Sequence, residues 1–227
     1  MLFRRYGMVS AGVVDPQDRL VGMITNDDVI DVIDEEAEED LLALAGVGDA
    51  NLRSGLWETL QGRSSWLFIN LLTAVLASAV IGLFEATIER LVALAVLMPI
   101  VASMGGNAGT QTMTVAVRAI ALRQLDATAT RQFVLRELIV ATTNGLLFAA
   151  LAAGLSYLWF GDPEIAIVMA VAMMANLLVA GLSGTFVPVG LMRAGVDPAV
   201  ASSVFVTTIT DVVGFFVFLG LAALYLM

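Results

Sequence analysis

The stretch SSWLFINLLTAVLASAVIGLF, Ser64–Phe84, carries no charged residue over its whole length. An apolar run of about 20 residues is long enough to cross roughly 30 Å of hydrocarbon as a helix. Four more such runs follow, so the pattern predicts membrane helices near 64–84, 91–118, 134–160, 165–192 and 199–226. The expected fold class is therefore an all-α integral membrane protein with five transmembrane helices.

The composition agrees with a chain that lies mostly in lipid. Its 227 residues are 59% hydrophobic and 14% charged, with a mean hydropathy of +0.91, far from the range of soluble domains. Residues 1–63 hold 13 acids against five arginines, whereas residues 64–227 hold eight acids against six. A short acidic part thus precedes the membrane part, and this acidity argues against nucleic acid as a partner.

The chain contains neither cysteine nor histidine. Thiolate and imidazole metal sites, Cys–His and Ser–His catalysis and haem ligation are therefore all excluded. Oxygen remains as the metal ligand, which favours hard cations such as Mg²⁺. An intramembrane enzyme is disfavoured on the same grounds.

Arginine is the only basic residue, and its placement predicts the orientation in the membrane. Arg53 and Arg63 flank the start of the first span, and Arg193 lies between the fourth and fifth spans. Four more surround the link between the second and third spans, at positions 118, 123, 131 and 136. The positive-inside rule then places the N-terminus in the cytoplasm and the C-terminus outside.

Residues 11–33 have the pattern of strand, turn, strand and helix, with the turn at Asp15–Asp18 and a helix cap at Asn26 or Asp27. The helix is amphipathic, holds nine carboxylates between Asp27 and Asp40, and is expected to end near Gly46. So short a segment cannot bury a core of its own. We therefore expect three parts: the tail of a larger domain at 1–26, a connecting helix and lead-in at 27–62, and the membrane domain at 63–227.

The acidic helix has two interpretations. Such a run of carboxylates is commonly a solvated face. Alternatively, it packs against another acidic surface only when divalent cations screen the charges, so that loss of the cations would release it. The second interpretation would make the helix a cation sensor.

In the fifth span, small and hydroxyl-bearing residues share a helical face with one carboxylate, Asp211. Small residues alone indicate helix packing. An ionised carboxylate near the middle of a span, however, must face water, a cation or a buried partner, and we expect no intramembrane basic residue to pair with it. We predict Asp211 as a cation ligand, with a protonated structural aspartate as the alternative. The rest of this face is Ser203, Thr207, Thr210 and Gly214.

The second span contains Pro99 followed by GGNAGTQ at residues 105–111. Proline removes a backbone donor, and the glycines allow either close helix approach or local unwinding. The Gly-x-x-x-Gly pair is a weak signal whose plain interpretation is packing. The residues predicted to line a pore from this span are Gly105, Gly106, Asn107 and Gln111.

One carboxylate compensates a divalent ion poorly, so a two-fold homodimer with Asp211 from each copy near the axis is expected. Magnesium keeps much of its hydration shell and suits a wide ring of oxygen ligands, although these residues alone do not separate it from Mn²⁺ or Ca²⁺. A passive channel is the leading hypothesis. The alternative is a secondary transporter that couples a divalent cation to another ion.

These motifs resemble the MgtE family of magnesium channels and transporters, which is related to the solute carrier 41 proteins. The resemblance rests on Pro99 with residues 105–111, on Asp197-Pro198, and on TTITDVVG at residues 207–214. LVGMITNDDVID at residues 20–31 also looks like the end of a CBS domain, and residues 36–40 resemble the acidic helix behind it. The match covers essentially the whole chain.

The resemblance implies a bacterial inner-membrane homodimer in which the second and fifth spans line a pore for Mg²⁺, with Asp211 on the ion. It also implies regulatory Mg²⁺ between the cytoplasmic part and the pore, at Asp28, Asp31, Glu36, Glu39, Asp40 and Asp197. Family members normally carry two complete CBS domains, of which only the last fragment is expected here. Nucleotide binding by a CBS pair is accordingly not expected.

Overall fold

The computed structural model describes residues 3, 6–46, 55–122, 124 and 127–227, without the side chains of residues 40, 41, 58, 127, 128 and 201. Five of its helices are long and apolar enough to cross a membrane, which confirms the predicted all-α membrane fold. The elements are β1 Ser10–Val14, β2 Leu20–Thr25, α2 Asn26–Leu44, α3 Leu56–Gly82, α4 Glu85–Arg90, α5 Val92–Ala121, α6 Ala127–Phe160, α7 Pro163–Arg193 and α8 Pro198–Tyr225.

Two helices begin well before the predicted spans. The third span was predicted from 134 but α6 begins at Ala127, and the first was predicted from 64 but α3 begins at Leu56. Hydropathy marks where a helix enters lipid, whereas the backbone hydrogen-bond ladder continues through polar residues into water. The short helix α4 was not predicted because six residues are too few to show a helical period.

The N-terminal part has the predicted order of strand, turn, strand and helix. β1 pairs antiparallel with β2, and Asp15 Oδ1 closes the turn by accepting from the backbone N–H groups of Gln17 and Arg19, both at 2.9 Å. Assignment of residues 1–26 to a CBS domain stays a prediction.

Thr25 caps α2, so the predicted cap at Asn26 or Asp27 was wrong by one or two residues. The backbone N–H and Oγ1 of Thr25 both donate to Asp28 Oδ2 at 2.7 Å, and the N–H of Asp28 donates to Thr25 Oγ1 at 3.4 Å. This is a reciprocal capping box, in which each side chain satisfies a backbone N–H of the other residue. These hydrogen bonds lower the pKa of Asp28 below its ordinary value.

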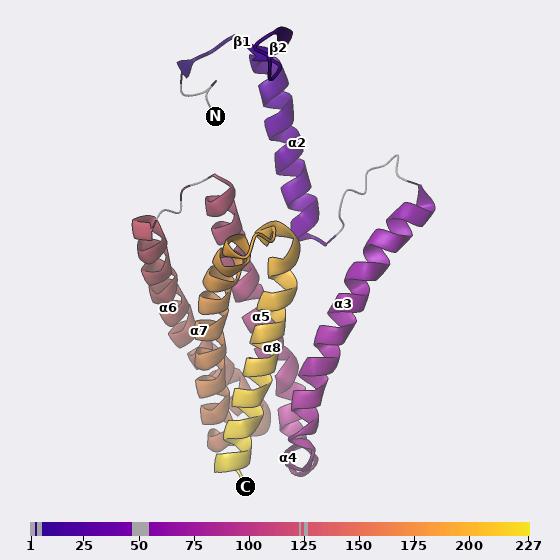
Figure 1. Cartoon of the computed structure of the whole chain (residues 1–227). Coiled ribbons are helices and arrows are strands. Elements are labelled where there is room, and N and C mark those ends of the chain that lie inside the picture. The colour runs from indigo at the N-terminus through magenta and orange to yellow at the C-terminus, as the bar shows by residue number, and fades with distance from the viewer. Residues whose placement is uncertain (1–2, 4–5, 47–54, 123, 125–126) are drawn as a thin grey trace.

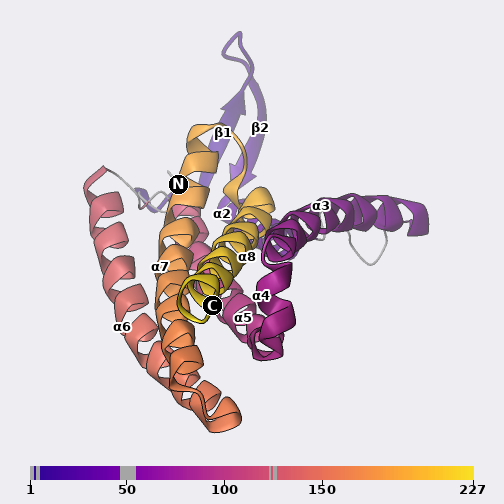
Figure 2. The same ribbon diagram turned by 90° about the horizontal axis from the view of Figure 1, so that it is seen from below.

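The membrane bundle is built around α7. In the most apolar window of α7 56% of the residues are buried, compared with 6% for α3. α7 packs against α5, α6 and α8, while α3 leans away from the bundle and meets α8 near one end (Figures 1 and 2). The packed body of one copy therefore consists of α5 to α8.

Asn176 on α7 is completely buried at the place where α5, α7 and α8 meet. Its Nδ2 donates to the carbonyl oxygen of Val101 on α5 at 2.8 Å. A Cβ on Gly105 or Gly214 would collide with the Asn176 side chain, and at Gly214 the separation from Nδ2 would be 2.7 Å. The two glycines thus form the slot that admits this amide between the helices.

Gly184 on α7 makes the closest backbone approach to α5. A Cβ there would lie 2.7 Å from the carbonyl oxygen of Gly109 and 2.8 Å from Cβ of Thr112. Gly109 in turn faces Val206 of α8. The sequence left open whether the glycines of α5 serve close approach or unwinding. The structure shows close approach, because α5 remains helical through Pro99 and both glycines of the Gly-x-x-x-Gly pair.

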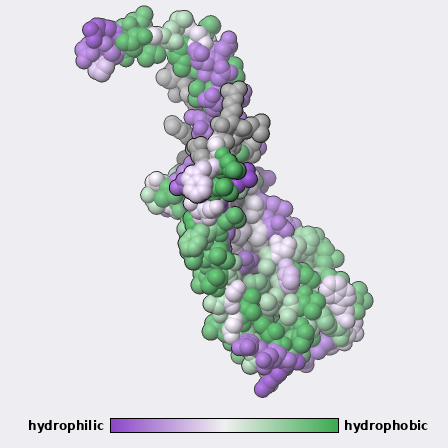
Figure 3. Space-filling model, turned by 90° about the vertical axis from the view of Figure 1, so that its right-hand side faces the viewer, coloured by the Kyte–Doolittle hydropathy of each residue, from purple (hydrophilic) through white to green (hydrophobic). Residues whose placement is uncertain are grey.

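The acidic helix α2 stands on the bundle as an arm that ends in the β1–β2 hairpin (Figure 1). At its foot, Ala43 and Leu44 pack against an apolar cluster that contains Val117 of α5 and Ala199 of α8. Hydrophobic side chains cover most of the bundle on the face drawn in Figure 3, whereas hydrophilic ones are frequent on the arm. The arm therefore touches the bundle where α8 begins.

Gly184→Ala is expected to destabilise the bundle by about 1–3 kcal/mol, because the added methyl group meets backbone atoms of α5 that cannot rotate away. Gly190→Ala on the same helix is the matched control, since a Cβ there has nothing within 4 Å. Thermal unfolding in detergent measures both variants. Equal midpoints for the two would contradict this packing.

Asp28→Ala is expected to loosen the first turn of α2, because the reciprocal bonds with Thr25 are lost. The pKa of Asp28 is lowered on folding. The stability that its carboxylate contributes is therefore fully present above the unfolded pKa near 3.8, and it is lost as the pH falls through the lowered pKa of the folded state. Hydrogen exchange of the first α2 amides in the full chain reports the loss. Asp34→Ala, farther along α2, is the control, and equal protection in both variants would count against the cap.

Candidate functional site

Asp211 lies near the midpoint of α8, about 20 Å from either end at 1.5 Å per residue. It is half-buried, as are Ser203 and Thr207 on the same side of the helix. Among the described residues, one ion pair is formed, between Arg19 and Asp15 at 2.9 Å. Within that part of the chain, Asp211 is thus a membrane-embedded carboxylate without a basic partner.

The predicted polar face of α8 is divided by the packing. Thr210 is completely buried, and Gly214 is buried against Asn176. Thr207 Oγ1 donates to the carbonyl oxygen of Ser203 at 2.9 Å, and Thr210 Oγ1 donates to that of Thr207 at 2.9 Å. Because these hydroxyl protons are used inside the helix, the oxygen lone pairs remain as acceptors. The polar strip that is left partly open consists of Ser203, Thr207 and Asp211.

A second polar strip runs along α5 beside the first. Its members Ser103, Asn107, Thr110 and Thr114 are exposed in the single copy. Asn107 Nδ2 donates to Ser103 Oγ at 3.4 Å. The strips of α5 and α8 meet at Gly106, where a Cβ would lie 3.9 Å from Cγ2 of Thr207. Two membrane helices therefore present adjacent oxygen-bearing surfaces on the outside of one bundle.

The residues predicted to line a pore from α5 fall in three different places. Gly105 is buried in helix packing, whereas Gly106 and Asn107 belong to the polar strip. Gln111 is exposed but lines a separate cavity of about 280 Å³ between α5, α6 and α7. Their assignment to a pore remains a prediction.

Glu137 on α6 is a second embedded carboxylate, so the expectation of a single one was incomplete. It is half-buried ten residues into α6, and its Oε2 accepts from Thr112 Oγ1 of α5 at 3.0 Å. Arg136, which lines the same cavity, also lies within the apolar span rather than in the link before it. In the sequence, this embedded carboxylate could have been recognised from the pair Arg136-Glu137, which an uninterrupted apolar run follows.

Among the predicted regulatory acids whose side chains the structure describes, no metal site is formed in one copy. Asp28 caps α2, and Asp197 caps α8 by accepting from the N–H of Ala199 at 2.8 Å. Asp31, Glu36 and Glu39 are exposed on α2, and the side chain of Asp40 lies outside the described residues. Among the acidic side chains that the structure describes, no three form a metal site. Regulatory binding stays a prediction.

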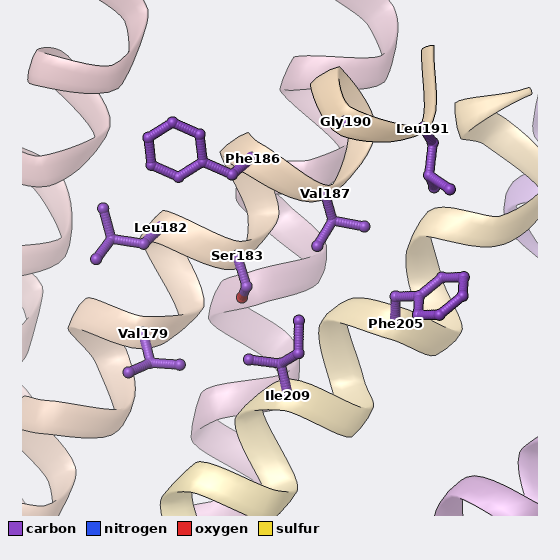
Figure 4. A pocket seen from close by; sticks show the side chains of 9 residues that line it. All are labelled: Val179, Leu182, Ser183, Phe186, Val187, Gly190, Leu191, Phe205 and Ile209. Atoms are coloured by element: carbon purple, nitrogen blue, oxygen red, sulfur yellow. The ribbon is translucent and has the colours of Figure 1, made fainter. Parts of the chain in front are cut away.

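A groove of about 520 Å³ between α7 and α8 lies apart from both polar strips. Figure 4 shows its apolar lining, in which Leu182 and Phe186 extend from α7 and Phe205 and Ile209 extend from α8. Ser183 contributes the single hydroxyl among its lining side chains. Such a lining offers an ion one hydroxyl and no carboxylate, so the candidate site is the polar surface of α5 and α8.

Comparison with known proteins shows that the chain is similar to proteins named as transporters. Residues 98–221, which include both polar strips, match the model of the MgtE family of divalent cation transporters. The magnesium transporter MgtE of Thermus thermophilus is 37% identical over 228 residues, which cover 99% of this chain and 50% of that protein. The MgtE proteins of Bacillus subtilis and Enterococcus faecalis are 31% and 30% identical, over 99% and 98% of this chain.

The chain spans about half the length of these curated relatives. With five membrane-spanning helices and bacterial relatives, it is an integral protein of the bacterial plasma membrane. The family model covers more than half of the chain, and it includes the helices that hold the candidate site. The chain therefore belongs to the MgtE family of divalent cation transporters.

Proposed function

We propose that this chain transports Mg²⁺ as a channel, along a path between α5 and α8 of two copies. The observation that carries the proposal is the position of Asp211, half-buried at the midpoint of α8 beside the polar strip of α5. Transport rather than catalysis is its function, in keeping with relatives that are named as transporters.

The polar strip of α5 is incompatible with a lipid environment on that side. Asn107 and Thr110 are exposed in one copy, yet they lie in the middle third of a membrane helix. Exposed amides and a carboxylate in hydrocarbon are costly, and such groups in membrane helices face protein or water. A second copy placed against this side would enclose the strips around a water-filled path.

Two-fold symmetry also matches the charge of the ion. Each copy supplies one embedded carboxylate on its polar strip, so a dimer would bring two negative charges to a path for a divalent cation. The hydroxyls of Ser203 and Thr207 would accept hydrogen bonds from water on the ion. Mg²⁺ sheds water reluctantly and is commonly bound through its hydration shell.

The choice of Mg²⁺ over other divalent ions rests on the relatives, which are named magnesium transporters. The channel mechanism is favoured over coupled transport because the strips line one continuous surface on α5 and α8. In the proposed orientation, the N-terminal arm and the link between α5 and α6 lie in the cytoplasm, where the arginines gather.

Regulation by cytoplasmic Mg²⁺ is part of this proposal. The foot of α2 packs beside Ala199, two residues from Asp197 at the start of α8. Cations bound between the α2 carboxylates and Asp197 would hold the arm against the helix that carries Asp211. The carboxylates of Asp31, Glu36, Glu39 and Asp40, together with Asp28, are the proposed ligands on the arm.

Asp211→Ala is expected to lower Mg²⁺ flux by at least about tenfold, because the path loses its fixed negative charge. The assay is uptake into proteoliposomes that contain a Mg²⁺-sensitive dye. Thr208→Val is the matched control, since the Thr208 hydroxyl donates to Val204 O at 2.6 Å within the helix. Undiminished flux in Asp211→Ala, at equal protein incorporation, would refute the site.

A Mg²⁺ gradient alone is expected to drive uptake by the wild-type chain, since a channel needs no second ion. Proteoliposomes with equal proton and sodium concentrations on both sides provide this test. Mg²⁺ movement that follows an imposed proton or sodium gradient, with Mg²⁺ equal on both sides, would instead establish coupled transport.

A further inference from the structure

Two polar side chains hold α5 from its packed side, at different depths in the membrane. Asn176 Nδ2 donates to Val101 O at 2.8 Å, and Thr112 Oγ1 donates to Glu137 Oε2 at 3.0 Å. Val101 and Thr112 are separated by about 16 Å along the helix axis. The first contact comes from α7 and the second from α6, so α5 is fixed by two different neighbours.

Thr112 lies on the opposite side of α5 from the polar strip. At 100° per residue it points about 160° away from Thr110 and from Thr114. Thr112 is buried, whereas Thr110 and Thr114 are exposed. The hydrogen bond to Glu137 is therefore made on the side of α5 opposite the strip.

Apolar contacts alone would leave this direction weakly determined. Membrane helices gain little from hydrophobic burial against one another, because lipid is equally apolar. α6 packs mainly on α7 and barely touches α5 elsewhere, so the Glu137 contact is a main link between α6 and α5. Polar contacts have direction and fix register in such settings.

The surroundings of Glu137 allow its carboxylate to remain at this depth. It borders the cavity of about 280 Å³ that Gln111, Arg136 and Asn144 also line. At roughly 30 Å³ per water molecule, this space can hold several waters. One carboxylate oxygen can thus be hydrated while the other accepts from Thr112.

We propose that Glu137 is a positioning residue for the ion path: by accepting from Thr112, it sets the rotation of α5 and thus the direction of the Asn107–Thr114 strip. The effect of Glu137 on Mg²⁺ transport rests on the proposed function. Its effect on the rotation of α5 does not, and that rotation can be measured separately.

The absence of cysteine from the chain permits a direct test of helix rotation. A single cysteine is introduced by Thr114→Cys, and its reaction rate with a charged, membrane-impermeant thiosulfonate is measured in proteoliposomes. Glu137→Ala is expected to slow this reaction several-fold as the strip turns, while Glu137→Gln, which keeps an acceptor, retains the rate. Asn144→Ala is the matched control, because Asn144 lines the same cavity.

Mg²⁺ flux provides the second readout, with the native residue at position 114. Glu137→Ala and Thr112→Val are each expected to raise the half-saturating Mg²⁺ concentration by roughly 2- to 30-fold. The double variant should show no further loss, because both changes remove the same bond. Thr112→Ser, which keeps the hydroxyl, should behave as wild type. If Glu137→Ala does not fold, Thr112→Val tests the same bond.

The outcomes separate the inference from the proposed function. Unchanged cysteine reactivity in both Glu137→Ala and Thr112→Val would overturn the positioning role. A Glu137→Gln variant as defective as Glu137→Ala in flux, with normal reactivity, would also overturn it and show that the charge itself is required. If Glu137→Ala and Thr112→Val alter the cysteine reactivity while the wild-type chain transports no Mg²⁺, the positioning role is supported and the proposed function is refuted.

Discussion

The amide of Asn176 is the contact on which the arrangement of the bundle depends. It is completely buried, bonds to Val101 O, and occupies a slot made by Gly105 and Gly214. One side chain thereby sets the separation of α5, α7 and α8 near the middle of the membrane. Because the slot is closed on both sides by glycine Cα atoms, the amide cannot move away from one helix without meeting the other.

This contact relates the packing of the bundle to its candidate site. Gly214 lies one turn from Asp211, and Gly105 is next to Gly106, which faces Thr207. The slot therefore also fixes how close the two polar strips lie. Polar groups serve two purposes in these helices: those that point inward hold the helices together, and those that point outward require water or a second copy.

The sequence predicted the membrane helices because an uncharged run of 20 residues has few alternatives in lipid. It predicted Asp211 for the same reason, since a carboxylate in such a run is conspicuous. It did not separate Thr210 and Gly214 from Asp211, because a strip 100° wide spans both a packed and an open side and only the neighbouring helices decide which is which. Glu137 was overlooked although it lies inside the predicted span 134–160, and its contact with Thr112 could not be predicted because that residue lies on another helix.

The division of the polar residues also supports the proposed dimer. A bundle that needed no partner would bury the strip of α5 as thoroughly as it buries Asn176. Instead Asn107, Thr110 and Thr114 remain exposed, and few residues of α3 are fully buried in its most apolar window. Lipid can cover α3, but it cannot solvate the amides and hydroxyls of α5. The exposed polar strip of α5 is thus the feature that the proposed two-fold assembly would account for.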